Sequence, residues 1–268
     1  MNQMTSRRSG GRAARRASRA APLDDTLRPV RPGMEGGTLN VLSPPQIEKI
    51  HNAALEALEE IGLADAPQSG IDYMTAAGAI LGEDGRLRFP RALVEDTLAR
   101  ANRGITLHGR DPAHDLQLSG TRVHYGTAGA AVHMVDVEGQ HYRESTLQDL
   151  YDAARITDTL DNIHFLQRPM VARDIEDACE MELNTVYACC AGTSKHVGTS
   201  FTDPAHAREA IKLLHMIAGG EAAWRARPFV SNSNCFVVPP MKFATESCQV
   251  MEACIEGGMP VLLLSAGM

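Results

Sequence analysis

The chain has 268 residues, of which 44% are hydrophobic, so it is long enough to bury a large core. Its formal net charge is −7, but six arginines lie within the first twenty residues, which contain no acid. Without these six, the chain has 20 basic and 33 acidic residues, a net charge of −13, which argues against nucleic-acid binding by the folded part. No apolar run approaches the ~20 residues needed to span a bilayer.

Residues 1–39 are rich in Arg, Gly and Pro, and we expect them to form a disordered arm. The arginines could contact an acidic partner, but a solvated tail is the favoured interpretation. The arm lacks the apolar h-region of a secretory signal. It resembles a transit peptide in being Arg-rich and free of acids, and that alternative stays open.

Residues 40–121 are predicted to form an α+β region. Ser43 and two prolines open a helix that ends at Gly62. Its apolar stripe consists of Ile47, Ile50, Ala54, Leu58 and Ile61. A second helix is predicted over residues 69–81, a turn over 82–85, a strand over 86–89, and a helix from Pro90 to residue 101. Alternating segments between residues 105 and 143 predict short strands joined by hairpins.

Residues 122–268 show the spacing of a parallel α/β fold. After a first strand within residues 123–135, strands are predicted to begin near Ile163, Val197, Phe229 and Val261, about 32 to 34 residues apart. A βαβ unit with its crossover helix has this length. We therefore predict an α/β fold with about the first five strands of a (β/α)8 TIM-type barrel.

The helices between these strands have clear start and stop signals. Thr146 and Asp149 form a capping box before the first helix. Asp203 and Pro204 open the helix after the strand near Val197, and this helix stops at residues 219–220. Its apolar side consists of Ala207, Ile211, Leu214 and Ala218. A helix from about Lys242 is expected to bury Ala244, Cys248, Met251 and Ile255 and to end at residues 257–258. Since Met268 follows an apolar strand with no covering helix, we expect a truncated barrel and an incomplete chain.

Polar residues at the carboxyl ends of the predicted strands are the candidates for chemistry, because barrel active sites lie there. The predicted substrate-binding residues are Gln167, Arg168, Ser200, Asn232, Asn234 and Ser265, with Thr199 beside them. A guanidinium at the end of a strand can grip a carboxylate or phosphate through two parallel hydrogen bonds, so Arg168 is the strongest candidate. A structural salt bridge between Arg168 and Asp174 is the alternative.

No metal site is predicted. His124 and His133 lie in strand-like stretches on either side of residues 126–129 and could approach each other as ligands, but packed or surface histidines are the favoured interpretation. The chain has no metal-binding His spacing, no phosphate-loop motif and no nucleophile-elbow motif. The six cysteines form no C-x-x-C motif and suit a reducing cytosol, so a cytoplasmic protein is expected.

Six segments together resemble the trimethylamine methyltransferase family, the corrinoid-dependent methyltransferases of methylated amines. They are GGRAARRA, LSPPQIEKIHNAALEALEEIG, YGTAGAAVHMVD, GTSKHVGTSF, PFVSNSNCFVVPPMKF and PVLLLSAGM. The resemblance implies a (β/α)8 barrel and full-length members about twice as long as this chain.

The resemblance also implies an activity: transfer of a methyl group from trimethylamine, or from a quaternary amine such as glycine betaine, to the Co(I) of a corrinoid carried by a partner protein. No cofactor would be bound directly. The catalytic residues, including any pyrrolysine, would lie beyond Met268, and this fragment alone would be inactive. A betaine carries a carboxylate, for which Arg168 is a plausible partner; a homo-oligomer is compatible with the sequence.

Two other functions stay open at this point. The chain could be a non-catalytic barrel fragment that only binds a partner, such as a corrinoid protein. It could also belong to a different TIM-barrel lyase or metal-dependent hydrolase, for which the histidines and the fold are the only support.

Overall fold

The structure is a computed structural model in which residues 16, 31–37 and 39–265 are described. The chain divides into two compact units, Met1–Arg31 and Pro32–Met268, and the account below concerns the second. The predicted disorder of the arm falls mainly on residues outside the described set. A boundary near residue 121, inside the second unit, stays a prediction.

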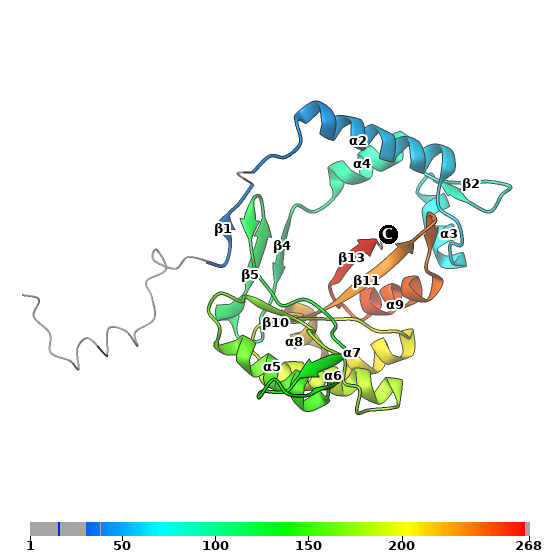
Figure 1. The fold of residues 1–268 in the computed structure, drawn as a ribbon. Helices are drawn as coiled ribbons and strands as arrows, with labels where there is room; N and C mark the ends of the chain where they lie inside the picture. Colours follow the sequence, from blue (N-terminus) through cyan, green and yellow to red (C-terminus); the bar gives the residue numbers. More distant parts are fainter. Residues whose placement is uncertain (1–15, 17–30, 38, 266–268) are drawn as a thin grey trace, which may run out of the picture. The chain divides into compact units, whose positions relative to one another are not determined.

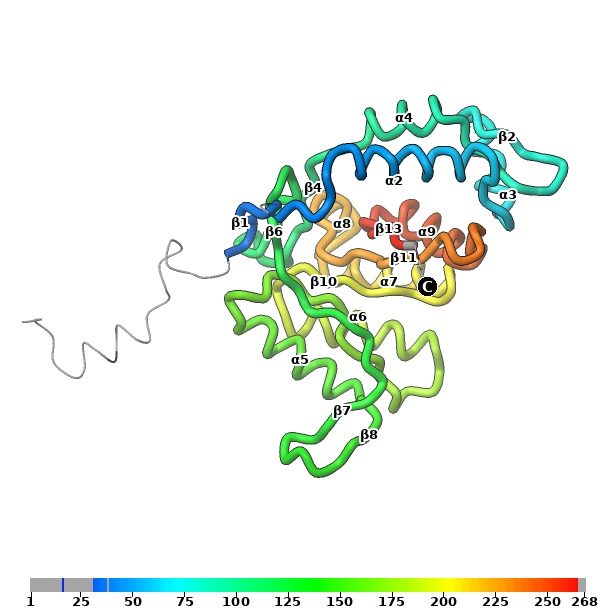
Figure 2. Tube along the Cα trace, turned by 45° about the horizontal axis from the view of Figure 1, so that its top comes forward, coloured from blue at the N-terminus to red at the C-terminus, as the bar shows by residue number. Residues whose placement is uncertain are grey.

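The N-terminal helices follow the predicted pattern in part. Ser43 caps α2 (Pro44–Glu56) with Gln46 in a capping box, and the π-helical turn η1 (Ala57–Ile61) ends at Gly62, whose φ is 72°. Then come α3 (Gln68–Ala76), the hairpin of β2 (Ile80–Leu81) and β3 (Leu87–Arg88), and α4 (Arg91–Arg100). Figures 1 and 2 show α2 and α4 running side by side.

Two details of this region differ from prediction. The helix predicted to reach residue 81 ends at Ala76, because residues 80–81 pair with β3 instead. The stripe of the first helix is largely exposed: Ile47, Ile50 and Ile61 are about half accessible, and only Leu55, off the predicted stripe, is buried. The apolar period therefore identified a helix but not a buried face.

The expected short strands are confirmed. β1 (Met34–Glu35) pairs with β6 (Arg122–Val123), and β4 (Gly104–Leu107) pairs with β5 (Leu116–Ser119) on either side of the 3-10 turn η2 (Pro112–His114). β7 (His133–Val135) and β8 (Tyr142–Glu144) form a hairpin that projects away from the large sheet (Figure 2).

The large sheet contains four parallel strands in the order β9 (Phe165–Gln167), β10 (His196–Thr199), β11 (Val230–Val238) and β13 (Val261–Ser265) (Figure 1). β12 (Lys242–Phe243) pairs antiparallel with the end of β11. The helices are α5 (Leu147–Thr159), α6 (Ala178–Gly192), α7 (Pro204–Ala218), α8 (Glu221–Ala226) and α9 (Thr245–Glu256). All four predicted strand positions are confirmed.

The sheets do not confirm the predicted first barrel strand. Between β6 and β7, isolated parallel bridges join Gly126 to Phe165 and Ala131 to Met170. The Phe165 ring occupies the space where a Cβ on Gly126 would lie, so only a glycine backbone fits against β9 at this point. No continuous ladder of hydrogen bonds forms along this stretch. The sheets therefore show a mixed α/β fold but do not confirm a partial barrel of five strands.

The helix caps are as predicted, with one exception. The Thr146 hydroxyl accepts from Asp149 N in a capping box, and Asp203 accepts from Ala205 N at the start of α7. The last helix begins three residues later than expected because residues 242–243 are used by β12. Ile255 is exposed, and the buried side of α9 consists of Cys248, Val250, Ala253 and Cys254.

One large core lies between the sheet and its helices. Leu166, Val197 and Val230, at matching positions in β9, β10 and β11, pack there with α5, α6, α7 and α9. The cavity described below lies on the opposite face of the sheet. β13 pairs only with β11 among the described strands, and its Leu262, Leu263 and Leu264 are exposed.

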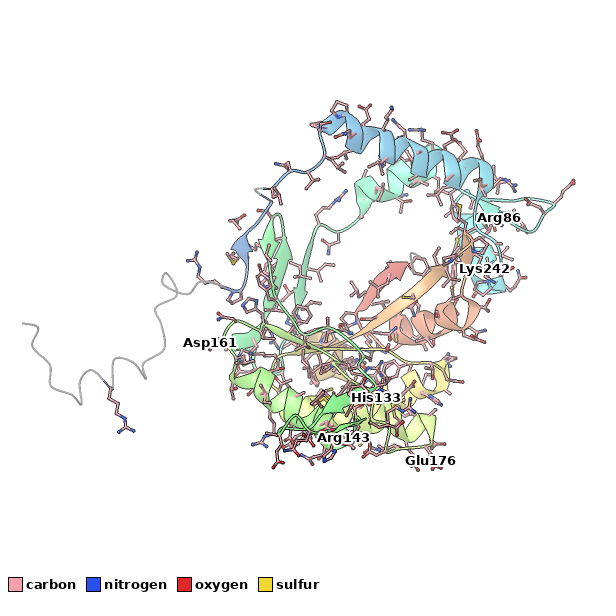
Figure 3. All side chains as sticks on the ribbon, viewed as in Figure 1. Arg86, His133, Arg143, Asp161, Glu176 and Lys242 are labelled. Carbon is pink, nitrogen blue, oxygen red and sulfur yellow. The ribbon has the colours of Figure 1, made fainter. Side chains whose placement is uncertain are left out.

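A second, smaller core fastens the N-terminal helices to the end of the sheet. Leu63 and Leu87 pack there with Phe243 and Cys248. The Arg86 guanidinium donates to the backbone oxygens of Ile61, Gly62 and Met241, and its side chain lies near Lys242 in Figure 3. Of the helices in the part of the chain that the structure describes, none combines the length and the apolar character of a membrane span.

Candidate functional site

A cavity of about 550 Å³ lies at the carboxyl ends of β9, β10, β11 and β13. Its walls come from those strands, from the loops that follow them, and from the segment before β7. The lining residues are Thr127, Ala128, Gly129, Phe165, Gln167, Arg168, Ser200, Phe201, Ser233, Cys235, Ser247, Leu262 and Leu264. Cavities of this size accept small organic molecules, and this end of a parallel sheet is where such sites are built.

Gln167, Arg168 and Ser200 are predicted site residues that line the cavity. The Gln167 amide donates to the Ser233 hydroxyl at 3.2 Å. To reach Ser233, the Gln167 side chain passes over Gly198, where any Cβ would collide with it. The Thr127 hydroxyl donates to the Gln167 carbonyl at 2.5 Å, which ties the neighbouring segment to the end of β9. Hydrogen-bonded polar groups therefore connect the segment at Thr127, β9 and β11 along one wall of the cavity.

Asn232 and Asn234 do not line the cavity. Side chains alternate between the two faces of a strand, and in β11 it is Ser233 and Cys235 that face the cavity, opposite Leu262 and Leu264 of β13. Asn232 and Asn234 point toward the helices and are buried. Asn234 donates to the Ser247 carbonyl, whereas both side-chain polar atoms of Asn232 lack a hydrogen-bond partner among the described residues.

Thr199 pairs in register with Asn232 and is buried as well, and Ser265 ends β13. The predicted substrate-binding role of these residues stays a prediction; what the structure shows is their placement.

Arg168 is a half-buried cation without a carboxylate partner among the described residues. Its Nη2 donates to the Ser200 hydroxyl at 3.1 Å, and no ion pair involves it. Burial lowers the pKa of the guanidinium, but an arginine keeps its charge in proteins. The alternative of a salt bridge with Asp174 is wrong: no ion pair among the described residues joins the two, and the Asp174 carboxylate accepts from Leu147 N at the start of α5. Guanidinium N–H groups thus remain available to an anionic ligand.

Several lining residues were not singled out from sequence. Phe165 and Phe201 supply aromatic surface, and Ser233 and Cys235 supply a hydroxyl and an exposed thiol. The alternation in residues 230–235 was a signal that the odd-numbered and even-numbered positions face opposite sides. It could not show which side would be covered by helices.

The structure does not bring His124 and His133 together. His124 packs beside His164 with ring centroids 6.0 Å apart, whereas His133 stacks on Tyr142 in the projecting hairpin (Figure 3). Among the described residues no group of three His, Cys, Asp or Glu side chains could hold a metal ion. Burial raises the pKa of Cys190 and of Cys254 to about 12, so these thiols are packing residues rather than nucleophiles.

The amino end of the sheet carries a different set of polar groups. The Lys195 ammonium donates to the carbonyls of Thr157, Leu160 and Ile163 at 2.6 to 2.8 Å, at the end of α5. The imidazole of His196 lies between the His108 carbonyl and the Ser231 hydroxyl, and burial lowers its pKa to about 4. These groups are buried and internally paired, so they stabilise the fold rather than bind a ligand.

The structure defines a mixed α/β protein with a cavity at the carboxyl edge of a parallel sheet. The sequence model of the trimethylamine methyltransferase (MTTB) family matches residues 8–268, and the chain belongs to that family.

Curated relatives agree with this assignment. Trimethylamine methyltransferase MttB of Desulfitobacterium hafniense is 29% identical over 236 residues, which cover 88% of this chain and 47% of the relative. The corresponding protein MttB1 of Methanosarcina mazei is 27% identical, with coverage of 88% and 48%. The glycine betaine methyltransferase of D. hafniense is 25% identical, with coverage of 84% and 47%. The chain thus spans about half the length of the curated relatives it matches.

A solved structure, the monomethylamine methyltransferase of Methanosarcina barkeri, aligns with a TM-score of 0.49 at 11% identity and covers 82% of this chain and 45% of that one.

Proposed function

We propose that this chain is part of a methyltransferase that moves a methyl group from a methylated amine to the Co(I) of a corrinoid carried by a partner protein. Membership of the family and the names of its relatives support the reaction class. The observation that carries the substrate proposal is the Arg168 guanidinium, which has no carboxylate partner among the described residues and lines a cavity of small-molecule size.

The preferred substrate in this proposal is a quaternary amine that also bears a carboxylate. When its methyl group leaves, the C–N electron pair stays on nitrogen and a neutral tertiary amine results, so no further activation is required. The enzyme must chiefly hold the amine in line with the nucleophile. Arg168 and Ser200 would bind the carboxylate, and the aromatic side chains of Phe165 and Phe201, which line the cavity, would contact the cationic end.

The residues present suit the amine and not a resident corrinoid. The cavity lining contains no histidine that could ligate cobalt, and its volume is that of a small-ligand pocket. When its partner protein presents it, the corrinoid supplies the nucleophile that accepts the methyl group. This chain's own residues orient the amine and exclude water around it.

Because the chain spans about half the length of the curated relatives it matches, we also propose that a competent catalyst has the length of those relatives. The free edge of β13 and its exposed leucines form an apolar border beside the cavity. We therefore assign no catalytic residue within this chain. The six free cysteines are compatible with a cytoplasmic enzyme.

The alternatives receive less support. A metal-dependent hydrolase needs ligands that the described residues do not bring together. A non-catalytic binding fragment differs from the main proposal in one measurable respect: a full-length version would not methylate an added corrinoid protein.

The first test uses the Cys235 thiol as a reporter, because it lies in the same cavity as Arg168. Labelling by anionic iodoacetate and by neutral iodoacetamide is followed at the Cys235 peptide by mass spectrometry. We expect Arg168→Ala to lower the ratio of the two rates about tenfold, since a charge-assisted hydrogen bond contributes about 1.5 kcal/mol or more. Arg173→Ala, at an exposed arginine paired with Glu144, is the matched control. An unchanged ratio in Arg168→Ala would remove the anion site.

The second test measures turnover by a full-length version. Arg168→Ala should raise KM for glycine betaine and leave KM for trimethylamine, which has no carboxylate, unchanged. Equal effects on both substrates would contradict the proposed role of Arg168.

A further inference from the structure

Glu182 is a buried acid on α6 that no step above uses. Only 2% of its surface is accessible. One carboxylate oxygen accepts from the backbone N–H of Thr202 at 2.9 Å and from the Thr202 hydroxyl at 2.8 Å. The other accepts from His206 Nδ1 at 3.0 Å. Three donors from one neighbouring segment therefore converge on a single carboxylate.

Of these donors, Thr202 lies in the loop from β10 to α7, which forms one wall of the cavity, and His206 lies in the first turn of α7. Ser200 and Phe201 line the cavity, and Thr202 directly follows them. Ser200 is also the residue whose hydroxyl accepts from the Arg168 guanidinium. At its far end the loop is held by Asp203, which caps α7. Glu182 holds the middle of the loop from the helix behind it.

Burying a carboxylate is costly unless several donors surround it, and a hydrophobic residue of similar size would stabilise the fold about as well. The position is therefore better explained by what the carboxylate fixes than by its contribution to stability. It accepts from backbone and side chain of the same residue, which restrains both the path of the loop and the direction of its side chains.

We propose that Glu182 is a positioning residue for the anion site: by holding Thr202 and His206, it keeps Ser200 and Phe201 against Arg168. This inference rests on the proposed function, because it concerns the carboxylate-binding end of the same cavity. A second effect points the same way. Burial lowers the pKa of Arg168, and the negative charge of Glu182 acts in the opposite direction, so Glu182 helps a cation without a carboxylate partner to remain there.

The test compares Glu182→Ala with Glu182→Gln. The amide oxygen of glutamine can still accept from Thr202, whereas alanine removes every acceptor. We expect Glu182→Ala to lower the iodoacetate-to-iodoacetamide rate ratio at Cys235 by about threefold to tenfold. Glu182→Gln should restore most of the ratio. Glu180→Ala, at an exposed acid of the same helix, should leave it unchanged. Hydrogen exchange of the Thr202 amide should quicken in Glu182→Ala and not in Glu180→Ala.

A purely structural role predicts a different result: a lower melting temperature of Glu182→Ala with an unchanged rate ratio, which would overturn the inference. If Glu182→Ala does not fold, Thr202→Val replaces it, because this change removes one donor and keeps the backbone N–H. A Thr202→Val ratio equal to wild type would then count against the proposal. Arg168→Ala distinguishes failure of the proposed anion site from failure of the positioning role of Glu182. If it leaves the ratio unchanged, the anion site fails; if it lowers the ratio and the Glu182 variants do not, only the positioning role fails.

Discussion

Each end of the parallel sheet contains a cation, buried Lys195 at the amino end and half-buried Arg168 at the carboxyl end. The two differ in how far the protein satisfies their N–H groups. At the amino end, all three N–H groups of Lys195 donate to backbone carbonyls. At the carboxyl end, Arg168 donates to the Ser200 hydroxyl and to no carboxylate among the described residues. Lys195 therefore satisfies backbone carbonyls of the protein itself, whereas Arg168 keeps N–H groups that can donate to a ligand.

Other polar groups at the two ends of the sheet follow the same division. Asp115 accepts two hydrogen bonds from Arg227 and one from His108, and His196 is held from both sides. Around Arg168 lie an open cavity, two aromatic rings and an exposed thiol. In a parallel α/β protein the amino end serves stability and the carboxyl end serves binding, and here hydrogen-bond saturation separates them.

Replacing Lys195 should give the largest loss of stability. Lys195→Met removes the donor of three carbonyls at the end of α5, and we expect the free energy of unfolding to fall by about 3 kcal/mol. Urea denaturation measures the change. Lys212→Met, at an exposed lysine paired with Glu209, should change it by less than about 0.5 kcal/mol. Equal effects in the two variants would contradict a structural role for the amino end.

The second-largest expected effect is a loss of stability in acid, which arises at the same amino end of the sheet. Burial lowers the pKa of His196 from its ordinary 6.5 to about 4, so the folded state binds this proton less readily than the unfolded state. Its contribution is complete above pH 6.5 and is lost as the pH falls toward 4. We expect a loss on the order of 2 kcal/mol between pH 7 and pH 5.

Chemical denaturation at several pH values, with His196→Asn, measures this effect. Asparagine can still donate to the His108 carbonyl but does not titrate, so the variant should lose less stability on acidification than wild type. His51→Asn, at an exposed histidine of α2, should retain the wild-type slope. A slope in His196→Asn equal to wild type would assign the acid sensitivity elsewhere.

The smallest effect on stability is expected at the carboxyl end. Arg168→Met removes one hydrogen bond and a desolvated charge, whose contributions oppose each other, so the free energy of unfolding should change by less than about 1 kcal/mol. Thermal and urea unfolding against Lys195→Met provide the direct comparison. A loss as large as that of Lys195→Met would mean that Arg168 is a structural cation.

The sequence predicted well those features that depend on neighbours along the chain. The capping box of Thr146, the cap at Asp203 and the starts of the four parallel strands are set within a few residues by local chemistry. The missing ladder at residues 123–135 was not predictable in this way, because the Phe165 ring that lies against Gly126 comes from a distant segment.

The candidate site divides along the same line. Sequence alone determined that polar residues follow the strands and that Arg168 stands at the end of one of them. Tertiary structure decided that Ser233 and Cys235 face the cavity while Asn232 and Asn234 face the helices. It also decided that Asp174 accepts from Leu147 N at the start of α5 and that Arg168 has no carboxylate partner among the described residues. The physical reason is that a strand's alternation defines two faces, and only the placement of helices and neighbouring strands determines which of them remains open.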